Sequence, residues 1–264
     1  LWTAKAAIFV TNNRKAKGVC MKTVAISHVG KVRKTNEDAV LVQCDAQPYY
    51  MLVADGMGGH AAGEIASKIA CFSVKKYIDD LEAKELNEDQ VLKAVEYANL
   101  QIVEETDRNK KLKGMGTTVT FAAFNDDNIV IAQVGDSSAY HFDGKNIKKI
   151  TKDHTYVQHL IDSGVIKKTA AGDYPFKNII TRALGMKELV VDIYNETWKK
   201  NDIILLCSDG LSNYTDDSTL IRILSADESI NKKAQLLIDF ALDGGGKDNI
   251  SVILASNYPM GDAK

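Results

Sequence analysis

Short apolar runs that stop at an aspartate recur along this chain, and they constrain its fold more than any other feature. Tyr49–Ala54 is followed by Asp55-Gly56, and Ile203–Cys207 is followed by Ser208-Asp209-Gly210. Runs of this length are typical of buried strands. Asp-Gly is common in tight turns between strands, but a helical pattern follows Asp55 and Asp209. We therefore expect both aspartates to end a strand without forming a hairpin.

Hydrophobic periodicity predicts further strands around two long helices. Lys22–Val29 alternates apolar and polar residues, as a half-buried strand does. Ile65, Ile69 and Phe72 form one stripe of a helix that starts near Ala61. Asn87 and Gln90 resemble a helix cap, and the next helix carries an apolar stripe at positions 91, 95, 98 and 102. Strands are expected at 39–44, 117–124, 129–134, 138–142, 146–150, 188–194, 202–207 and 249–255, with helices at 154–163 and 232–242.

Many strands joined as hairpins, with two long helices inserted together, indicate an α+β fold with mostly antiparallel sheets. A tight turn is expected at Asp143-Gly144. Residues 1–20 differ in character, because a short apolar piece precedes a basic stretch, the reverse of a secretory signal. We expect Met21 to be the natural start, residues 1–20 to be a non-native or extension segment, and 21–257 to be one domain.

Composition excludes several classes of protein. The chain has 264 residues, of which 45% are hydrophobic and 26% charged, as in ordinary globular proteins. Thirty-three basic and 35 acidic residues give a net charge of −2, which does not indicate binding to nucleic acid. Apolar runs are shorter than the ~20 residues that span a bilayer, so no membrane insertion is expected. Four cysteines without a C-x-x-C pair favour a reduced, cytoplasmic protein.

If the strand ends meet at one edge, several carboxylates lie close together. Asp136 follows another apolar run, and Asp248 precedes the last strand. Like charges ~4 Å apart repel by ~4 kcal/mol at an effective dielectric constant of ~20, so such a cluster needs cations or bound protons. Oxygen ligands favour Mg²⁺ or Mn²⁺, and one carboxylate between two ions is typical of phosphoester hydrolysis. Ordinary turns remain the alternative reading of these aspartates.

Arg33 lies five residues before Asp38 in a run rich in charges. The planar guanidinium of arginine suits a phosphate dianion better than the ammonium of lysine. A solvated charge run is the alternative interpretation of this segment.

Six motifs occur in a characteristic order. They are Arg33-x-x-Asn36-Glu37-Asp38, Asp55-Gly56-Met57-Gly58-Gly59-His60, Gly114-Met115-Gly116-Thr117-Thr118, Gly135-Asp136-Ser137, Ser208-Asp209-Gly210 and Lys247-Asp248-Asn249. From about Met21 to Ala255 the chain resembles the bacterial branch of the metal-dependent protein phosphatase family (PPM, type 2C). This resemblance implies a four-layer αββα fold, in which a central sandwich of two antiparallel sheets carries helical pairs on both outer faces.

The resemblance also implies a reaction and a set of site residues. Metal-activated water hydrolyses phosphoserine and phosphothreonine without a phosphoenzyme. Two Mn²⁺ or Mg²⁺ ions and a weaker third are expected. The implied ligands are Asp55 between the two ions, the Gly56 carbonyl, Asp209, Asp248, Asp38 and, directly or through water, Glu37. Arg33 is expected to bind the substrate phosphate and Asp136 the third ion.

Some positions depart from the family pattern or remain open. Ser138 stands where members often have arginine, and the flap at about 153–185 carries Tyr174-Pro175 in place of a His-Pro pair. His60 either acts as a general acid or hydrogen-bonds within its own loop. The expected partners are phosphoproteins modified by a cognate Ser/Thr kinase, and the expected state is a monomer. The alternative to an enzyme is an inactive binding module with the same fold.

Overall fold

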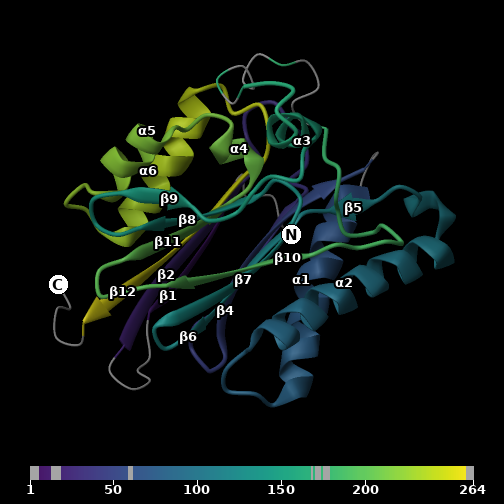
Figure 1. Ribbon diagram of the computed structural model, residues 1–264, viewed down its shortest axis with the longest axis horizontal. Coiled ribbons are helices and arrows are strands. Elements are labelled where there is room, and N and C mark those ends of the chain that lie inside the picture. Colours follow the sequence, from purple (N-terminus) through teal and green to yellow (C-terminus); the bar gives the residue numbers. More distant parts are fainter. Residues whose placement is uncertain are drawn as a thin grey trace.

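The computed structural model describes residues 6–12, 19–58, 62–167, 169, 174 and 179–259. Two antiparallel sheets packed face to face form the centre of this part of the chain (Figure 1). The first sheet runs in the order β1 (Ala6–Asn12), β2 (Val19–His28), β12 (Ile250–Pro259), β11 (Ile203–Cys207), β8 (Ser138–Phe142) and β9 (Ile147–Lys149). The second runs β10 (Asp192–Thr197), β7 (Asn128–Val134), β6 (Val119–Asn125), β4 (Tyr49–Met57) and β3 (Asp38–Gln43), with β5 (Gly116–Thr117) paired to β4.

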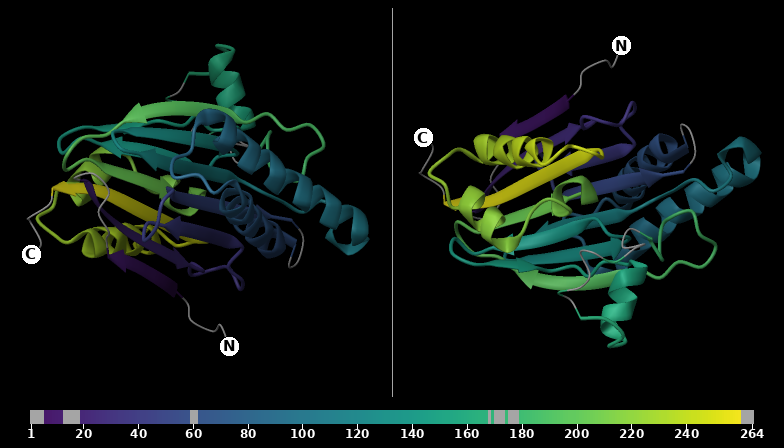
Figure 2. Two further views of the ribbon diagram at one scale, coloured as in Figure 1. Left: turned by 90° about the horizontal axis from the view of Figure 1, so that it is seen from below. Right: turned by 90° about the horizontal axis from the view of Figure 1, so that it is seen from above.

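Helices cover the outer face of each sheet. The second sheet packs on α1 (Ala62–Leu81) and α2 (Glu88–Arg108), and the first packs on α5 (Asp217–Leu224) and α6 (Ile230–Asp243). The shorter helices are α3 (Tyr156–Asp162), α4 (Asp209–Ser212) and the 3₁₀ turn η1 (Lys110–Leu112). Figure 2 shows α3 projecting from the side of the sandwich that carries β10. The αββα prediction is therefore confirmed.

The central strands are buried on both faces. In β11, Ile204 and Leu206 pack between the two sheets, whereas Ile203 and Leu205 pack against α5 and α6. Met51 and Val53 of β4 likewise face the space between the sheets, and alternate β4 residues face α1 and α2. Burial on both faces explains why these runs are continuously apolar instead of alternating.

The predicted stripe on α1 is wrong at Phe72. That side chain is 70% exposed, and the buried face instead includes Ala66, Ala70, Val74 and Ile78 at four-residue spacing. Small residues let the helix axis approach the sheet closely, so the larger side chain lies on the outer surface. By contrast, the predicted cap of α2 is confirmed, because Asn87 and Gln90 exchange reciprocal hydrogen bonds.

Helix α5, the η1 turn and β1 were not predicted, and β10 starts later than predicted. Helix α5 has no counterpart in the prediction, and β10 begins at Asp192, later than the predicted 188–194. Residues 6–12 form β1, which pairs with β2 from Ala6↔His28 to Asn12↔Lys22. The segment expected to be an extension thus supplies an edge strand. None of the helices among the described residues is both long and apolar enough to cross a membrane.

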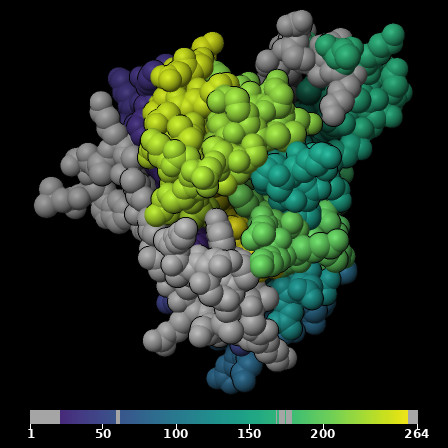
Figure 3. Space-filling view, turned by 90° about the vertical axis from the view of Figure 1, so that its left-hand side faces the viewer, coloured from purple at the N-terminus to yellow at the C-terminus, as the bar shows by residue number. Residues whose placement is uncertain are grey.

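The hairpin at Asp143-Gly144 is confirmed. Asp143 Oδ1 accepts hydrogen bonds from the backbone N–H groups of Lys145 (2.9 Å) and Asn146 (2.6 Å). Figure 3 shows this hairpin, in teal, between the α5–α6 pair and the green connection from β10 to β11. Lys148 pairs there with Glu196 at 2.5 Å.

Candidate active site

The pairing of the strands brings the predicted aspartates to one end of the sandwich. Asp38 at the start of β3 lies directly opposite Asp55 in β4. Strand β11 ends just before Asp209, and its neighbour β12 begins just after Asp248. Asp136 follows the end of β7. Asp38 faces Asp55 across β3 and β4, and it accepts a hydrogen bond from Ser208, the residue before Asp209, so the two sheets contribute to a single cluster.

Asp38 links the two sheets through hydrogen bonds. Its Oδ2 accepts from Ser208 Oγ at 2.8 Å and from Ser251 Oγ at 2.7 Å. Both serines belong to the first sheet or its immediate end, whereas Asp38 belongs to the second. The contact therefore fixes the separation of the β3 and β11 ends, where the carboxylates gather.

Three carboxylate oxygens in the cluster are buried and have no hydrogen-bond partner among the described residues. They are Asp38 Oδ1, Asp136 Oδ1 and Asp209 Oδ1. Buried polar atoms almost always have a partner, because an unmatched one retains its full desolvation cost. Three such oxygens within one cluster are suited to bind cations.

The pKa values of these carboxyl groups are displaced upward. Burial, followed by the charge of Asp209, raises the pKa of Asp136 to about 7. Burial also raises the pKa of Asp38 to about 7, although hydrogen bonds from Ser251 and Ser208 oppose the shift. The pKa of Asp209 rises to about 6 through burial and the charge of Asp248. Burial and the neighbouring carboxylates hold the pKa of Asp55 well above its ordinary range. The cluster thus favours bound protons or bound cations.

Gly56 lies where no side chain fits. A Cβ at Gly56 would lie 2.1 Å from the Gly63 carbonyl oxygen at the start of α1 and 2.5 Å from the Glu37 carbonyl oxygen. The Gly56 N–H donates to that Glu37 carbonyl at 3.2 Å. Burial raises the pKa of the Glu37 carboxyl, with the charge of Arg33 opposing the change. The Asp55-Gly56 turn is therefore packed directly against the segment that carries Glu37.

Arg33 lies at the rim of the cluster. Its Nη2 donates to Asp248 Oδ2 at 2.8 Å, and the two side chains are 48% and 35% exposed. A partly exposed guanidinium next to the carboxylates is placed to meet an anion that arrives from solvent.

Asn249 is a structural residue of the site that the pattern of carboxylates did not reveal. Its Oδ1 accepts from the Glu37 N–H at 2.8 Å, and its Nδ2 donates to the Val29 and Thr35 carbonyls, each at 2.9 Å. One amide thus holds the loop of Arg33 and Glu37 against the start of β12. Its place beside Asp248 in the sixth motif was the only signal in the sequence.

Thr118 connects the turns that carry Asp55 and Asp136. Its Oγ1 accepts from the Asp55 N–H at 2.9 Å and lies 2.7 Å from Ser137 Oγ. Gly135 has φ +105°, and a Cβ there would lie 2.5 Å from Thr118 Cγ2. Ser138, at the position of the expected arginine, donates to the Asp136 carbonyl at 3.4 Å. Thr118 of the Thr117-Thr118 motif therefore holds the turn of Asp55 and the Gly135-Asp136 turn in place.

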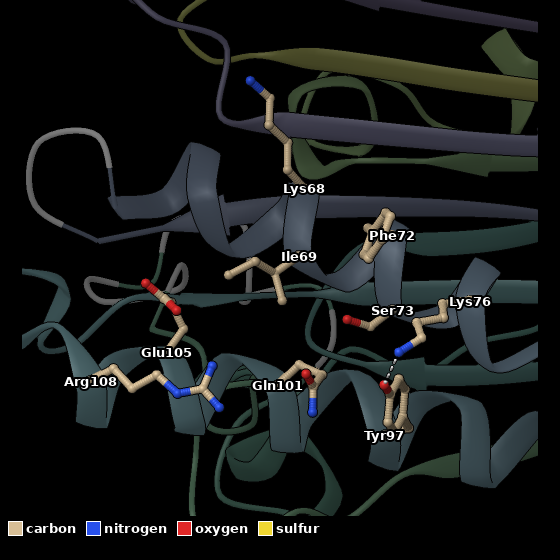
Figure 4. Close-up of a pocket in the computed structure, with 9 residues that line it drawn as sticks. All are labelled: Lys68, Ile69, Phe72, Ser73, Lys76, Tyr97, Gln101, Glu105 and Arg108. Atoms are coloured by element: carbon tan, nitrogen blue, oxygen red, sulfur yellow. Dashed lines mark hydrogen bonds between the residues drawn. The ribbon is translucent and has the colours of Figure 1, made fainter.

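Two other predicted residues, His60 and Pro175, are outside the described residues. In the part of the chain that is described, no three His, Cys, Asp or Glu side chains converge to hold one ion by themselves. A groove of about 370 Å³ lies between α1 and α2, where Phe72, Lys76, Tyr97 and other side chains line it (Figure 4). None of the aspartates of the cluster lines this groove.

Comparison with known proteins agrees with this geometry. The profile of the family described as Protein phosphatase 2C matches residues 27–235. The serine/threonine phosphatase stp of Listeria welshimeri is 39% identical over 238 residues, covering 88% of this chain and 94% of that protein. The crystal structure of the Mycobacterium tuberculosis serine/threonine phosphatase PstP/Ppp superposes with a TM-score of 0.83 at 36% identity, covering 91% of this chain and 99% of the other.

A further structure contains metal. The catalytic domain of PstP in complex with two manganese ions superposes with a TM-score of 0.80 at 35% identity, covering 91% of this chain and 99% of that one. The family profile, the sequence relatives and the shared fold lead to one conclusion. The chain belongs to the protein phosphatase 2C family, within its bacterial serine/threonine phosphatase branch.

Proposed function

We propose that this protein hydrolyses phosphoserine and phosphothreonine in proteins, with divalent cations held by the aspartate cluster. The observation that carries the proposal is the set of buried oxygens on Asp38, Asp136 and Asp209, which have no partner in the described part of the chain. These oxygens belong to carboxyl groups whose pKa values are raised, so a cation is the partner that stabilises their ionised form.

The chemistry of the available donors fits Mn²⁺ or Mg²⁺. Asp55, the Gly56 carbonyl, Asp209 and Asp248 are the proposed ligands of two ions, with Asp38 and Glu37 binding directly or through water. All are oxygen donors, which hard cations prefer. Mg²⁺ usually keeps several waters in its coordination shell, so water would complete the shell of each ion. The relative with two manganese ions supports this assignment.

Bound cations would lower the pKa of a coordinated water and neutralise charge on the phosphoryl oxygens. The protein itself supplies orientation. Asn249 holds the loop with Glu37, and Ser208 and Ser251 hold Asp38. Arg33 binds the phosphate dianion with the guanidinium nitrogens that Asp248 leaves free.

Asp136 is the proposed ligand of a third, weaker cation. It is 8% exposed, its Oδ1 has no hydrogen-bond partner within the described ranges, and Asp209 is the carboxylate that most affects its pKa. A site with fewer protein carboxylates binds its cation less tightly. In a calorimetric titration with Mn²⁺, Asp136→Ala should lose only the weakest binding step and most of the turnover. Loss of the tight steps would instead make Asp136 a ligand of the two core ions.

The main test is metal-dependent turnover on a phosphothreonine peptide. Phosphate release should require added Mn²⁺ or Mg²⁺ and stop when a chelator is added. Full turnover in metal-free buffer would refute the role of the cluster. A folded protein that is inactive with both metals would support the alternative of a binding module.

Phosphoproteins produced by a cognate Ser/Thr kinase are the proposed substrates, and a monomer is the proposed state. We also propose a reducing, cytoplasmic location. It is supported by Cys71 and Cys207, which carry thiols and form no disulfide.

A further inference from the structure

A buried histidine supports the turn that carries Asp136. His154 is 7% exposed, and its Nδ1 accepts the hydrogen bond of the Gly135 N–H at 3.1 Å. The His154 backbone N–H donates to the Gly135 carbonyl at 2.9 Å. Both polar groups of Gly135 are therefore bound by one residue. Because Gly135 directly precedes Asp136, His154 restrains the direction in which the Asp136 carboxylate points.

The other side of the His154 ring contacts a carboxylate. Nε2 lies 3.1 Å from Asp192 Oδ2, and Arg182 Nη1 donates to Asp192 Oδ1 at 2.8 Å. Since Nδ1 accepts from a backbone N–H, the proton of the neutral ring resides on Nε2 and is donated to Asp192. Asp192 thus selects the tautomer that can hold Gly135, and Arg182 orients Asp192.

His154 also contacts the base of the flap through its backbone. The Thr181 N–H donates to the His154 carbonyl at 2.8 Å, and Thr155 forms a bridge with Ile180. Leu184 then exchanges backbone hydrogen bonds with Thr117, at 2.9 and 3.2 Å. Thr117 Oγ1 in turn donates to the Asp55 carbonyl at 2.9 Å. The segment 179–184 therefore connects the support of Asp136 with the turn of Asp55.

We propose that His154, Asp192 and Arg182 form a positioning unit, which aligns Asp136 for the weak cation and connects that site to the base of the flap. The inference rests on the proposed role of Asp136 as a cation ligand. None of the three side chains is a proposed metal ligand, so they act through the Gly135-Asp136 turn. Residues that orient metal ligands typically change metal affinity or activity on the order of 10- to 100-fold when they are replaced.

The test is the Mn²⁺ activation curve of Asp192→Asn, measured together with the weakest step of a calorimetric Mn²⁺ titration. This variant keeps the size of the side chain but removes the charge that fixes the His154 tautomer and pairs with Arg182. The half-saturating Mn²⁺ concentration should rise on the order of 10-fold. The KM for a phosphothreonine peptide should stay within about twofold of the parent, and saturating Mn²⁺ should restore much of the turnover. Arg182→Lys, which keeps the charge on a 40% exposed side chain, should shift the curve less and in the same direction.

A second His–Asp pair provides the matched control. His141 Nε2 lies 2.8 Å from Asp202 Oδ2, in the first sheet and away from the Gly135-Asp136 turn. Asp202→Asn should lower the melting temperature and leave the Mn²⁺ activation curve unchanged.

Each outcome decides the inference. Equal effects of Asp192→Asn and Asp202→Asn on the activation curve, or no shift with Asp192→Asn, would overturn the positioning role. If Asp192→Asn does not fold, Arg182→Lys becomes the test. An unshifted Mn²⁺ activation curve in that variant would then overturn the inference. Asp136→Ala separates this inference from the proposed function. If the Mn²⁺ activation curve of Asp136→Ala is not shifted, the third cation is refuted, and the positioning role is refuted with it. If the curve is shifted in Asp136→Ala and unchanged in Asp192→Asn, only the positioning unit is refuted.

Discussion

Replacing Asp136 by asparagine should stabilise the metal-free protein, and the gain should depend on pH. Burial raises the pKa of Asp136 from 3.8 to about 7. The folded state therefore binds more protons than the unfolded state between roughly pH 4 and 7, so the stability of the parent falls as pH rises through this range. A shift of roughly three pKa units corresponds to about 4 kcal/mol above pH 7, as an upper limit. Asparagine has no ionisable group and avoids this cost.

The difference in the free energy of unfolding between Asp136→Asn and the parent should grow by roughly 2–3 kcal/mol between pH 5 and pH 8. For a chain of this size, 1 kcal/mol changes the melting temperature by roughly 2–4 °C. The assay is thermal and urea unfolding of both proteins in chelator at several pH values. Asp80→Asn removes the same charge from the exposed end of α1 and should show no such widening. The reasoning would be refuted if the stability gain of Asp136→Asn did not change with pH, or if this variant were less stable than the parent at pH 8.

Asp209→Ala and Asp248→Ala should each abolish turnover on a phosphothreonine peptide and leave the circular dichroism spectrum unchanged, because both residues lie at strand ends outside the hydrophobic core. Turnover at the parent rate in either variant would contradict its assignment as a ligand. Arg33→Ala should chiefly raise KM, because its partner is the phosphate dianion of the ground state and uniform binding appears in KM. An unchanged KM in steady-state kinetics would argue against phosphate binding by Arg33. Deleting residues 1–20 should retain activity, because all six motifs follow this segment, but lower the melting temperature, because β2 loses its partner β1. Loss of folding would show that the segment is required.

The sequence determined the elements that depend on local chemistry. Continuous apolar runs marked β4 and β11, the Asn87–Gln90 pair marked the start of α2, and Asp143-Gly144 marked a hairpin. Each signal lies within a few residues, so it can be read without knowing what the segment packs against. The order of six motifs identified the family because each motif keeps its own short spacing.

Tertiary structure decided which of these residues meet. The register of β3 and β4 places Asp38 opposite Asp55, and the stacking of the sheets brings Ser208 and Ser251 to Asp38. Local periodicity assigned Phe72 to the buried face of α1, but the helix packs through its small residues, and only the sheet beneath it selects that face. The contact between His154 and Gly135 joins segments 19 residues apart. Such choices depend on contacts between distant parts of the chain, and these contacts exist only after the sheets have stacked.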